Sequence, residues 1–482
     1  MKRGLLIFSL LFLLKLSAEI RSVWVLLWNI TTESAIDQVI NTAVDCNQNE
    51  LLVEVRYRAD ALFDTSQGAY LYPNPEPVSY ILNNSSFDPL TYIIQQAHNN
   101  GLAVQAWIVV FNATQTDHYL IRQNYIYNNH RNWITYDKNG YQMNNGYRYG
   151  YFIDPGIPEV QEYLLNIVGN IAAGYPELDG IHLDYIRYPD ADLGYHPISQ
   201  ELYRAYCLNQ MDITYNEWRI MQINNFVEKA YHLIKEINPS LLLTAAVFAD
   251  IADANVSYAQ DWQSWLKNGI IDRVYPMAYD INYAKFSKHT EQMKLLNFDS
   301  KIVIGLRAWN ENGSSLALGK GASYNVQNVA RKIDLAREQG FAGISLFSYS
   351  GLIKGNAWAQ LTRLSYSEKA EYPFEKVSTP LVNQSVTELK QPPDVKLLRL
   401  NNEILIQLQI PSEGLWNWEL YKESFLLQHN RYYLKGNNID ILNVINPNIC
   451  ASIEPGQYIV QLYQENSSFK YFIPVELKIA NE

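Results

Sequence analysis

The stretch PEVQEYLLNIVGNIAAGYPELDGIHLDYIRYP, residues 158–189, contains one complete unit of the pattern that decides the fold. Its first half begins with proline and carries apolar residues at helical spacing up to a glycine, as amphipathic helices do. Its second half, DGIHLDY, is a short apolar run between polar residues, which is typical of a buried strand. The stretch therefore predicts a helix followed by a strand of a parallel sheet.

The same alternation extends from residue 21 to residue 349. Strands are predicted at residues 21–28, 50–57, 101–110, 179–185, 240–248, 271–279, 301–307 and 341–349. Helical patterns lie between them at residues 34–46, 88–100, 158–174, 216–237 and 325–340. Eight strands with interleaved helices predict an α/β fold, a (β/α)8 TIM barrel. A doubly wound sheet is the alternative, but no glycine-rich phosphate-binding turn follows the first strand.

Two connections between the predicted strands are much longer than the others. One runs from Asn112 to Pro158, and the other runs from Tyr188 to Tyr215. Both follow the C-terminal ends of strands, which is the face where TIM barrels build their active sites. Long ordered loops at such a place are more often functional than accidental.

The pattern changes at residue 371. Residues 371–392 are rich in Pro, Ser, Thr and Lys and have no helical periodicity, which indicates a linker. Residues 393–482 alternate apolar and polar residues over short segments, as the strands of a small antiparallel β-sandwich do. We therefore predict a barrel over residues 19–370 and a β-sandwich domain over residues 393–482, with a structural or a glycan-binding role.

The N-terminus is similar to a secretion signal. Lys2 and Arg3 precede an apolar run that Lys15 interrupts, and a small-residue cleavage site ends at Ala18. The run is shorter than the roughly 20 apolar residues that a membrane-spanning helix needs, and no later stretch is long and apolar enough. We therefore expect cleavage of residues 1–18 and an exported protein that is periplasmic, bound at the cell surface or secreted, with no membrane span after cleavage.

The composition limits the partners. The chain has 38 Lys and Arg against 49 Asp and Glu, a formal net charge of −11, and loss of the three cations in residues 1–18 would make it −14. Such a charge disfavours nucleic acid and anionic membrane surfaces. The 11 Trp and 36 Tyr offer flat faces that suit sugar rings, although core packing accounts for most of them. The three cysteines have no spacing typical of metal ligands.

Polar side chains gather at the ends of the predicted strands. Side chains alternate along a strand, so His182 and Asp184 face the barrel axis when Ile181 and Leu183 face the helices. The same reasoning assigns further residues to the axis or its rim: Glu54 and Arg56 with Asp60 in the next loop, Gln105 and Trp107, Asp250, Tyr279 and Asp280, and Arg307. Trp28, Trp107 and Trp309 fall at or near C-terminal strand ends, and we expect at least two of them to be sugar platforms.

Acids, arginines and aromatic residues thus converge on one rim. For any single residue, a structural ion pair such as Arg56 with Glu54 or Asp184 is the simpler explanation. Convergence from six strands in a chain with only 18% charged residues favours a site. Two carboxyl groups among aromatic platforms are what glycosidic bond cleavage requires, one to protonate the leaving oxygen and one to attack the anomeric carbon or activate water.

A metal site is a weaker interpretation of the same residues. His182 and Asp184 are two potential ligands, but no second histidine stands in a recognisable ligand pattern. We therefore expect no metal and no cofactor, with a glycan as the substrate. Two alternatives stay open, namely a non-catalytic glycan-binding barrel and a metal-dependent polysaccharide deacetylase.

Residues 20–365 resemble the glycosyl-hydrolase-like family ten, a family of exported bacterial TIM-barrel proteins that often carry a following β-domain. The resemblance rests on RSVWV (21–25), VEVRYRADALF (53–63), GLAVQAW (101–107), HRNWITYDKNG (130–140), DPGIPEVQEYLLNIV (154–168), DGIHLDYIRYP (179–189), IDRVYPMAYD (271–280) and GISLFSYSGL (343–352). It implies a glycosidase, and one relative is a divisome-localised glycosidase that acts on denuded peptidoglycan glycan strands.

The resemblance also implies roles for single residues. It aligns Arg56 and Asp60 with the Arg and Asp of the family's strand-two motif, and Asp184 with the first acid of its strand-four motif. The chain departs from the family where Tyr185 replaces a second Asp, which removes a candidate acid, and where Glu54 replaces Gln, which adds one.

These residues lead to a predicted mechanism. We expect Asp184 to be ionised, held by Arg56 or His182, and to act as the nucleophile or stabilising carboxylate. Asp280 is the first choice for the general acid because strand six faces strand four, and Asp250 and Glu54 follow. Arg187 begins the loop that covers the site and is a candidate for substrate binding.

Overall fold

The computed structural model describes residues 18–82, 86–144, 150–209, 213–309, 324–353 and 357–373, and the backbone of seven strands between residues 394 and 479. The predicted signal sequence, apart from its last residue, and most of the predicted linker lie outside the described residues. Signal cleavage and the domain boundaries therefore stay predictions.

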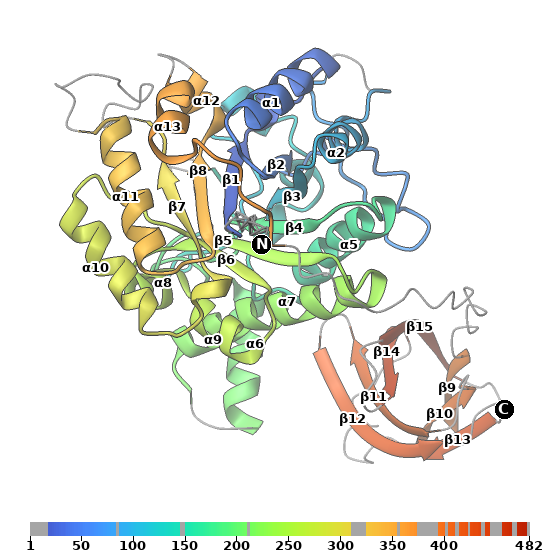
Figure 1. The fold of residues 1–482 in the computed structure, drawn as a ribbon. Coiled ribbons are helices and arrows are strands. Elements are labelled where there is room, and N and C mark those ends of the chain that lie inside the picture. Colours follow the sequence, from blue (N-terminus) through green and yellow to red (C-terminus); the bar gives the residue numbers. More distant parts are fainter. Residues whose placement is uncertain are drawn as a thin grey trace, which may run out of the picture.

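Eight parallel strands close a barrel in the order of the chain (Figure 1). They are β1 (Ile20–Val25), β2 (Glu50–Arg56), β3 (Ala103–Val109), β4 (Gly180–Asp184), β5 (Leu242–Phe248), β6 (Arg273–Met277), β7 (Val303–Arg307) and β8 (Gly343–Phe347). Pairing of β1 with β8 completes the ring. Each strand lies within a predicted strand or overlaps it, so the TIM barrel is confirmed and the doubly wound alternative is wrong.

Helices surround the ring of strands (Figure 1). The five helical patterns correspond to α1 (Glu33–Asp45), α2 (Pro89–Asn99), α5 (Pro158–Gly174), α7 (Tyr215–Ile237) and α11 (Val326–Glu338). The start of α7 shows why the sequence forms a helix there, since the side chains of Thr214 and Glu217 each accept a hydrogen bond from the other's backbone N–H. Further helices are α8 (Ile251–Tyr258), α9 (Trp262–Asn268), α10 (Tyr283–Lys294), α12 (Tyr349–Ile353) and α13 (Ala357–Ser365).

The barrel separates two hydrophobic cores. The outer core, between strands and helices, contains Val53, Ile181 and Leu183. The inner core fills the barrel with Ile20, Trp24, Leu52, Trp107, Ala246, Tyr275 and Val303. The predicted alternation of β2, β3 and β4 is therefore confirmed for these side chains, and large aromatic rings rather than aliphatic residues occupy much of the interior.

The two long connections pack against each other. The first contains α3 (His118–Ile121) and α4 (Tyr125–Asn129), and the second contains α6 (Pro197–Asn209). The backbone N–H of Gly194 in the second donates to the carbonyl oxygen of Tyr136 in the first at 3.1 Å. The described parts of the two connections are therefore joined beyond the C-terminal ends of β3 and β4.

The C-terminal region is all-β, as predicted. Its strands are β9 (Asp394–Leu400), β10 (Glu403–Gln409), β11 (Gly414–Lys422), β12 (Phe425–Leu434), β13 (Ile439–Asn443), β14 (Gly456–Gln464) and β15 (Lys470–Ile479). They pair in the order β12-β11-β14-β15-β9-β10-β13, antiparallel except for a short parallel pairing of β15 with β9. In the described part of the chain, no helix is both long enough and apolar enough to cross a membrane.

Candidate active site

Asp184 ends β4 at the C-terminal rim of the barrel, and only 8% of its surface is exposed. Its Oδ2 accepts a hydrogen bond from Nε1 of Trp107 at 3.2 Å, and its Oδ1 accepts one from the backbone N–H of Tyr185 at 2.7 Å. Burial raises the pKa of Asp184, whereas the positive charges of Arg187 and Arg58 and the two hydrogen bonds act against this increase. The carboxyl group is thus surrounded by groups that stabilise its anion.

Glu54 lies on β2, beside Trp107 of β3, and is buried. One of its oxygens accepts a hydrogen bond from the backbone N–H of Leu27 at 3.2 Å. Burial raises the pKa of Glu54 to about 8, and the negative charges of Asp184 and Asp60 contribute to the increase. A carboxyl group with this pKa carries a proton at neutral pH, which is the state that a general acid requires.

Asp60 and Arg58 complete the charged cluster. Burial raises the pKa of Asp60 to about 6, although Oγ of Ser79 donates a hydrogen bond to its Oδ2 at 2.7 Å. The positive charge of Arg58 lowers the pKa of Asp60 and also that of Glu54 and Asp184, so this cation acts on all three acids. Sequence reasoning missed Arg58, although it stands two residues after Arg56 in the motif VRYR.

The backbone around this cluster is strained. Arg58, Ala59 and Tyr185 have φ values of 104°, 58° and 51°, in a region that residues other than glycine rarely adopt. Such conformations persist where the surrounding structure enforces them, and they are concentrated at functional sites. The loops after β2 and β4 are therefore held in special geometry beside the acids.

A β-bulge in β2 changes the direction of Arg56. Glu54 lies opposite Trp107, but Arg56 lies opposite Ile108, so β2 has one residue more than β3 between these pairs. Ile108 belongs to the outer core. The bulge therefore turns Arg56 to the outer side of the barrel wall, whereas simple alternation had assigned it to the axis.

Arg56 consequently has a different partner from the predicted one. Its Nη2 lies 2.6 Å from Oε1 of Glu76, and both side chains are fully buried. The hydroxyl of Tyr163 also donates a hydrogen bond to this oxygen of Glu76, at 2.6 Å. The expectation that Arg56 holds Asp184 is therefore wrong, because the bulge and a loop residue that the sequence pattern did not single out give Arg56 a separate carboxylate.

His182 does not hold Asp184 either. Nε1 of Trp24 donates to Nε2 of His182 at 3.1 Å, so Nδ1 carries the hydrogen, which points to Oγ1 of Thr244 at 2.8 Å. Thr244 in turn donates to the amide oxygen of Gln105 at 2.6 Å. Burial lowers the pKa of His182 to about 3, so it is a neutral link inside the barrel.

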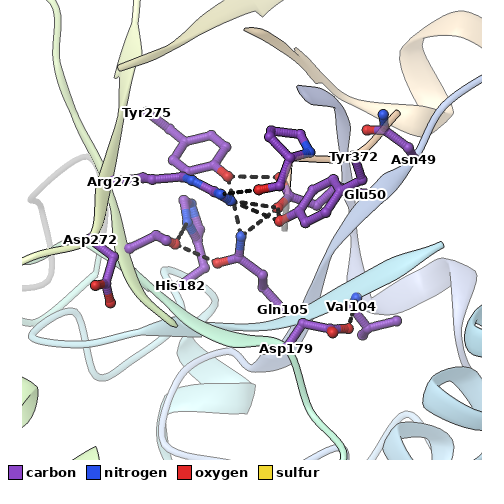
Figure 2. Close-up of polar contacts among 12 residues, drawn as sticks. Asn49, Glu50, Val104, Gln105, Asp179, His182, Asp272, Arg273, Tyr275 and Tyr372 are labelled. Atoms are coloured by element: carbon purple, nitrogen blue, oxygen red, sulfur yellow. Dashed lines mark hydrogen bonds and ion pairs between the residues drawn. The ribbon is translucent and has the colours of Figure 1, made fainter. Parts of the chain in front are cut away.

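This chain of hydrogen bonds ends at Glu50 near the N-terminal end of the barrel (Figure 2). Gln105 and Tyr275 donate to its two oxygens, each at 2.7 Å, and the hydroxyl of Tyr372 donates to Oε1. Nη1 of Arg273 lies 3.9 Å from Oε1. Gln105, expected to bind substrate, thus belongs to a buried structural network and not to the rim.

The other two predicted acids lie together around His289. Nδ1 of His289 is 2.9 Å from Oδ2 of Asp280, and its Nε2 is 3.6 Å from Oδ2 of Asp250. Nζ of Lys285 is 3.0 Å from Oδ1 of Asp280, and Asp250 also caps the N-terminus of α8. The structure therefore gives these acids partners of their own, whereas the charge of Asp184 acts on Glu54, whose pKa it raises.

Aromatic rings form a group beside Asp184. Tyr279 stacks on Phe347, with centroids 5.7 Å apart, and Trp309 contacts both rings edge-on, at 5.3 and 5.5 Å. Trp107 reaches the same Phe347 at 6.2 Å. Trp28 stands apart from this set in a short 3₁₀ helix (Leu27–Asn29) after β1, with 55% of its surface exposed. Contact of these rings with sugar stays a prediction.

Two arginines lie on aromatic faces near the rim. The guanidinium of Arg307 is 4.5 Å from the ring of Trp309, and its Nε donates to the carbonyl oxygen of Trp309 at 3.1 Å. The guanidinium of Arg187 is 4.5 Å from the ring of Tyr185. Arg187 is buried, and its charge is the strongest of the effects that lower the pKa of Asp184.

Parts of this chain are similar in sequence to two glycosyl hydrolases. Glycosyl hydrolase DigH of Escherichia coli (strain K12) is 28% identical to this chain over 221 residues, which are 41% of this chain and 47% of DigH. Glycosyl hydrolase YngK of Bacillus subtilis (strain 168) is 22% identical over 250 residues, which are 48% of this chain and 46% of YngK. The chain thus spans about half the length of the relatives that it matches.

A solved structure and a family profile also match this chain. The X-ray structure of the endo-beta-1,4-mannanase from Thermotoga petrophila aligns with 96% of this chain and 98% of its own, at 12% identity and a TM-score of 0.44. At these values, the assignment of the barrel depends on the strand pairing of this chain itself. The profile of the glycosyl hydrolase-like 10 family matches residues 19–308, which is more than half of the chain. The chain therefore belongs to the glycosyl hydrolase-like 10 family.

Proposed function

We propose that the protein is an exported glycoside hydrolase that cleaves glycosidic bonds in a polysaccharide or in the glycan strands of peptidoglycan. Membership of the glycosyl hydrolase-like 10 family supports a function of the glycoside-hydrolase type. The observation that carries the proposal is the pair Asp184 and Glu54. They are two buried carboxyl groups on β4 and β2, the strands on either side of β3, and the charge of Asp184 raises the pKa of Glu54.

The two groups have environments that suit different steps. Glu54, with a pKa of about 8, donates its proton to the glycosidic oxygen as the bond to the anomeric carbon breaks. Asp184, beside Arg187 and Arg58, stabilises the positive charge that develops on the sugar or attacks its anomeric carbon. A water molecule supplies the hydroxyl group of the new reducing end, and its proton restores the acid. Glu54 thus takes the role first assigned to Asp280.

The aromatic group is suited to hold the sugar at this pair. Trp309 and Tyr279 are within ring contact of each other and of Phe347, and Trp107 joins the group to Asp184 through its indole N–H. Flat apolar faces bind the C–H faces of sugar rings, whereas charged groups position the hydroxyls. Export rests on the expected signal sequence over residues 1–18 and is part of the same proposal.

The metal-dependent deacetylase is a weaker candidate. It requires His182 as a ligand near Asp184, but both ring nitrogens of His182 are hydrogen-bonded, to Trp24 and Thr244. No group of three or more potential metal-ligating side chains occurs in the part of the chain that the structure describes. The non-catalytic binding barrel is less favoured, because the raised pKa of Glu54, about 8, is what a general acid requires and recognition alone does not.

Turnover of a panel of glycans tests the proposal. Purified protein lacking residues 1–18 is incubated with peptidoglycan glycan strands and with neutral and acidic polysaccharides, and new reducing ends are measured with and without a chelator. We expect chelator-independent release from at least one glycan, which is abolished in Asp184→Asn and retained in Asp45→Asn, an exposed aspartate of α1. Glycan binding without release would favour the binding barrel, and release of acetate would favour the deacetylase.

A further inference from the structure

Arg187 is fixed in place by three aromatic rings. Its guanidinium carbon lies 4.5 Å from the ring centre of Tyr185, 4.8 Å from that of Phe248 and 5.4 Å from that of Tyr258. The backbone is fixed on both sides as well. The carbonyl oxygen of Ile186 accepts a hydrogen bond from Nε2 of Gln260 at 3.3 Å. The backbone N–H of Tyr188 donates to the carbonyl oxygen of Tyr258 at 3.0 Å. The guanidinium is thus held rigidly by groups that leave its hydrogen-bond donors unused.

The charge of Arg187 lacks a hydrogen-bonded counter-ion. The residue is 6% exposed, and its Nη1 is buried without a hydrogen-bond partner among the described residues. Within that same part of the chain, no carboxylate comes within the 4.0 Å of an ion pair with it. Asp184 is the acid whose charge is coupled to it, and the oxygens of Asp184 are hydrogen-bonded to Trp107 and Tyr185.

Arg56 provides a contrast within the same chain. Arg56 is also fully buried, but Glu76 accepts hydrogen bonds from its Nε and Nη2, and backbone carbonyls accept from Nη1. Burial of a guanidinium costs free energy unless its donors are satisfied. At Arg187, in contrast, no described residue accepts a hydrogen bond from the buried Nη1, and the charge acts on Asp184, the carboxyl group proposed to act on the anomeric carbon.

We infer that Arg187 is a recognition site for a carboxylate carried by the glycan substrate, on a sugar bound directly at Asp184. A guanidinium with free donors matches the two oxygens of a carboxylate, which it binds through two parallel hydrogen bonds. The inference rests on the proposed function and adds the substrate class, an acidic glycan. Two sugar chemistries carry such a group, a uronic acid and an N-acetylmuramic acid with a free lactyl ether.

Binding to matched glycans tests this inference without requiring turnover. Calorimetry with Asp184→Asn protein compares each free-acid oligosaccharide, oligogalacturonate and an oligomer of N-acetylglucosamine and N-acetylmuramic acid, with its carboxyl-amidated form. We expect one free acid to bind roughly 10- to 100-fold more tightly than its amide, because a charge-assisted pair in a buried site contributes that much affinity. The oligosaccharide that shows the preference identifies the source of the carboxylate.

Substitution of Arg187 then assigns the preference to this residue. Arg187→Gln in the same background should bring the free acid down to the affinity of the amide, while Arg187→Lys restores part of the difference. Arg331→Gln is the matched control, because Arg331 also stacks on a tyrosine, Tyr283 at 3.8 Å, but is exposed on α11. A residue that only keeps Asp184 ionised would instead reduce turnover of acidic and amidated glycans equally.

The outcomes separate this inference from the proposed function. Equal affinity for acid and amide, absence of binding by both free acids, or a preference that survives in Arg187→Gln overturns the inference. Hydrolysis of a neutral glycan without a preference for the free acid supports the proposed glycosidase and overturns the recognition site. A preference for the acid by a protein that hydrolyses none of the panel supports the recognition site and contradicts the glycosidase.

Discussion

Glu50 and Glu54 lie four residues apart on β2, and both are buried inside the same barrel, yet their surroundings differ. The oxygens of Glu50 accept hydrogen bonds from Gln105, Tyr275 and Tyr372, and Arg273 lies beside them (Figure 2). Glu54 accepts one backbone hydrogen bond and has acidic neighbours.

The difference distinguishes a structural carboxylate from a chemically active one. A buried carboxylate with several donors is stabilised as an anion and joins strands together. A buried carboxyl group with few donors and negative neighbours retains its proton and has capacity to transfer it. Burial of an acid alone therefore does not identify the proton donor, and what separates Glu54 from Glu50 is the number of hydrogen-bond donors around each carboxyl group.

The largest effect is expected at the rim, in the Asp184→Asn variant. Turnover should fall by roughly 10³-fold or more, because the carboxylate acts on charge that develops in the transition state. Glycan affinity should change little, and steady-state kinetics with a binding assay measure both. Wild-type turnover by the Asp184→Asn protein would contradict the assignment of Asp184 as a catalytic residue.

At the opposite end of the barrel, Glu50→Ala should affect stability and not chemistry. Removal of the carboxylate leaves Arg273 and three hydrogen-bond donors buried, so the free energy of unfolding should fall by about 3–5 kcal/mol. Urea unfolding measures this loss, and kcat of the folded protein should remain unchanged. Glu50→Gln, which retains one acceptor oxygen, is the milder variant. A normal stability with a reduced kcat would reverse the roles of the two ends.

The Glu54→Gln variant tests the proposed acid. Because the acid acts in its protonated form, wild-type activity should hold below pH 8 and decrease as the pH rises through about 8. The variant should lose about 10²-fold in kcat on natural glycans, less on aryl glycosides whose leaving group needs no proton, and its alkaline decrease should vanish. An unchanged pH–rate profile would contradict the assignment and return Asp280 to consideration.

The same residue predicts a dependence of stability on pH. Its pKa is about 8 in the folded protein against about 4.3 in an unfolded chain, so the fold favours the protonated form. The stability associated with this group is fully present below pH 4.3 and is lost as the pH rises through 8. Relative to the wild type, Glu54→Gln should therefore gain on the order of 5 kcal/mol between pH 4 and pH 9. Thermal unfolding of both proteins across this range measures the gain. The same dependence of stability on pH in the wild type and in Glu54→Gln would contradict the raised pKa.

The smallest effect is expected for the aromatic group. Trp309→Ala should weaken glycan binding about 10-fold with a small change in Tm, since Trp309 is only partly buried. Trp107→Ala should lower Tm strongly, because its ring belongs to the inner core. Calorimetric binding and thermal unfolding of both variants separate a sugar platform from a core residue, and a large loss of Tm in Trp309→Ala with unchanged affinity would place it in the core.

The eight strands of the barrel and the helices α1, α2, α5, α7 and α11 follow from the sequence alone, because each depends on the local period of apolar residues and on caps such as Thr214. The inward direction of Asp184 and Glu54 follows from alternation along their strands. Arg56 departs from this rule because a single extra residue in β2 reverses the alternation after it.

Only the tertiary structure decides which charges meet. Glu76 and His289 come from loop and helix positions that no period distinguishes, yet they engage Arg56 and Asp280. The pKa of Glu54 likewise depends on burial and on Asp184, which is remote in the chain. Local periodicity specifies where a side chain points relative to its own strand, whereas its protonation state depends on the donors, charges and solvent that chain folding brings around it.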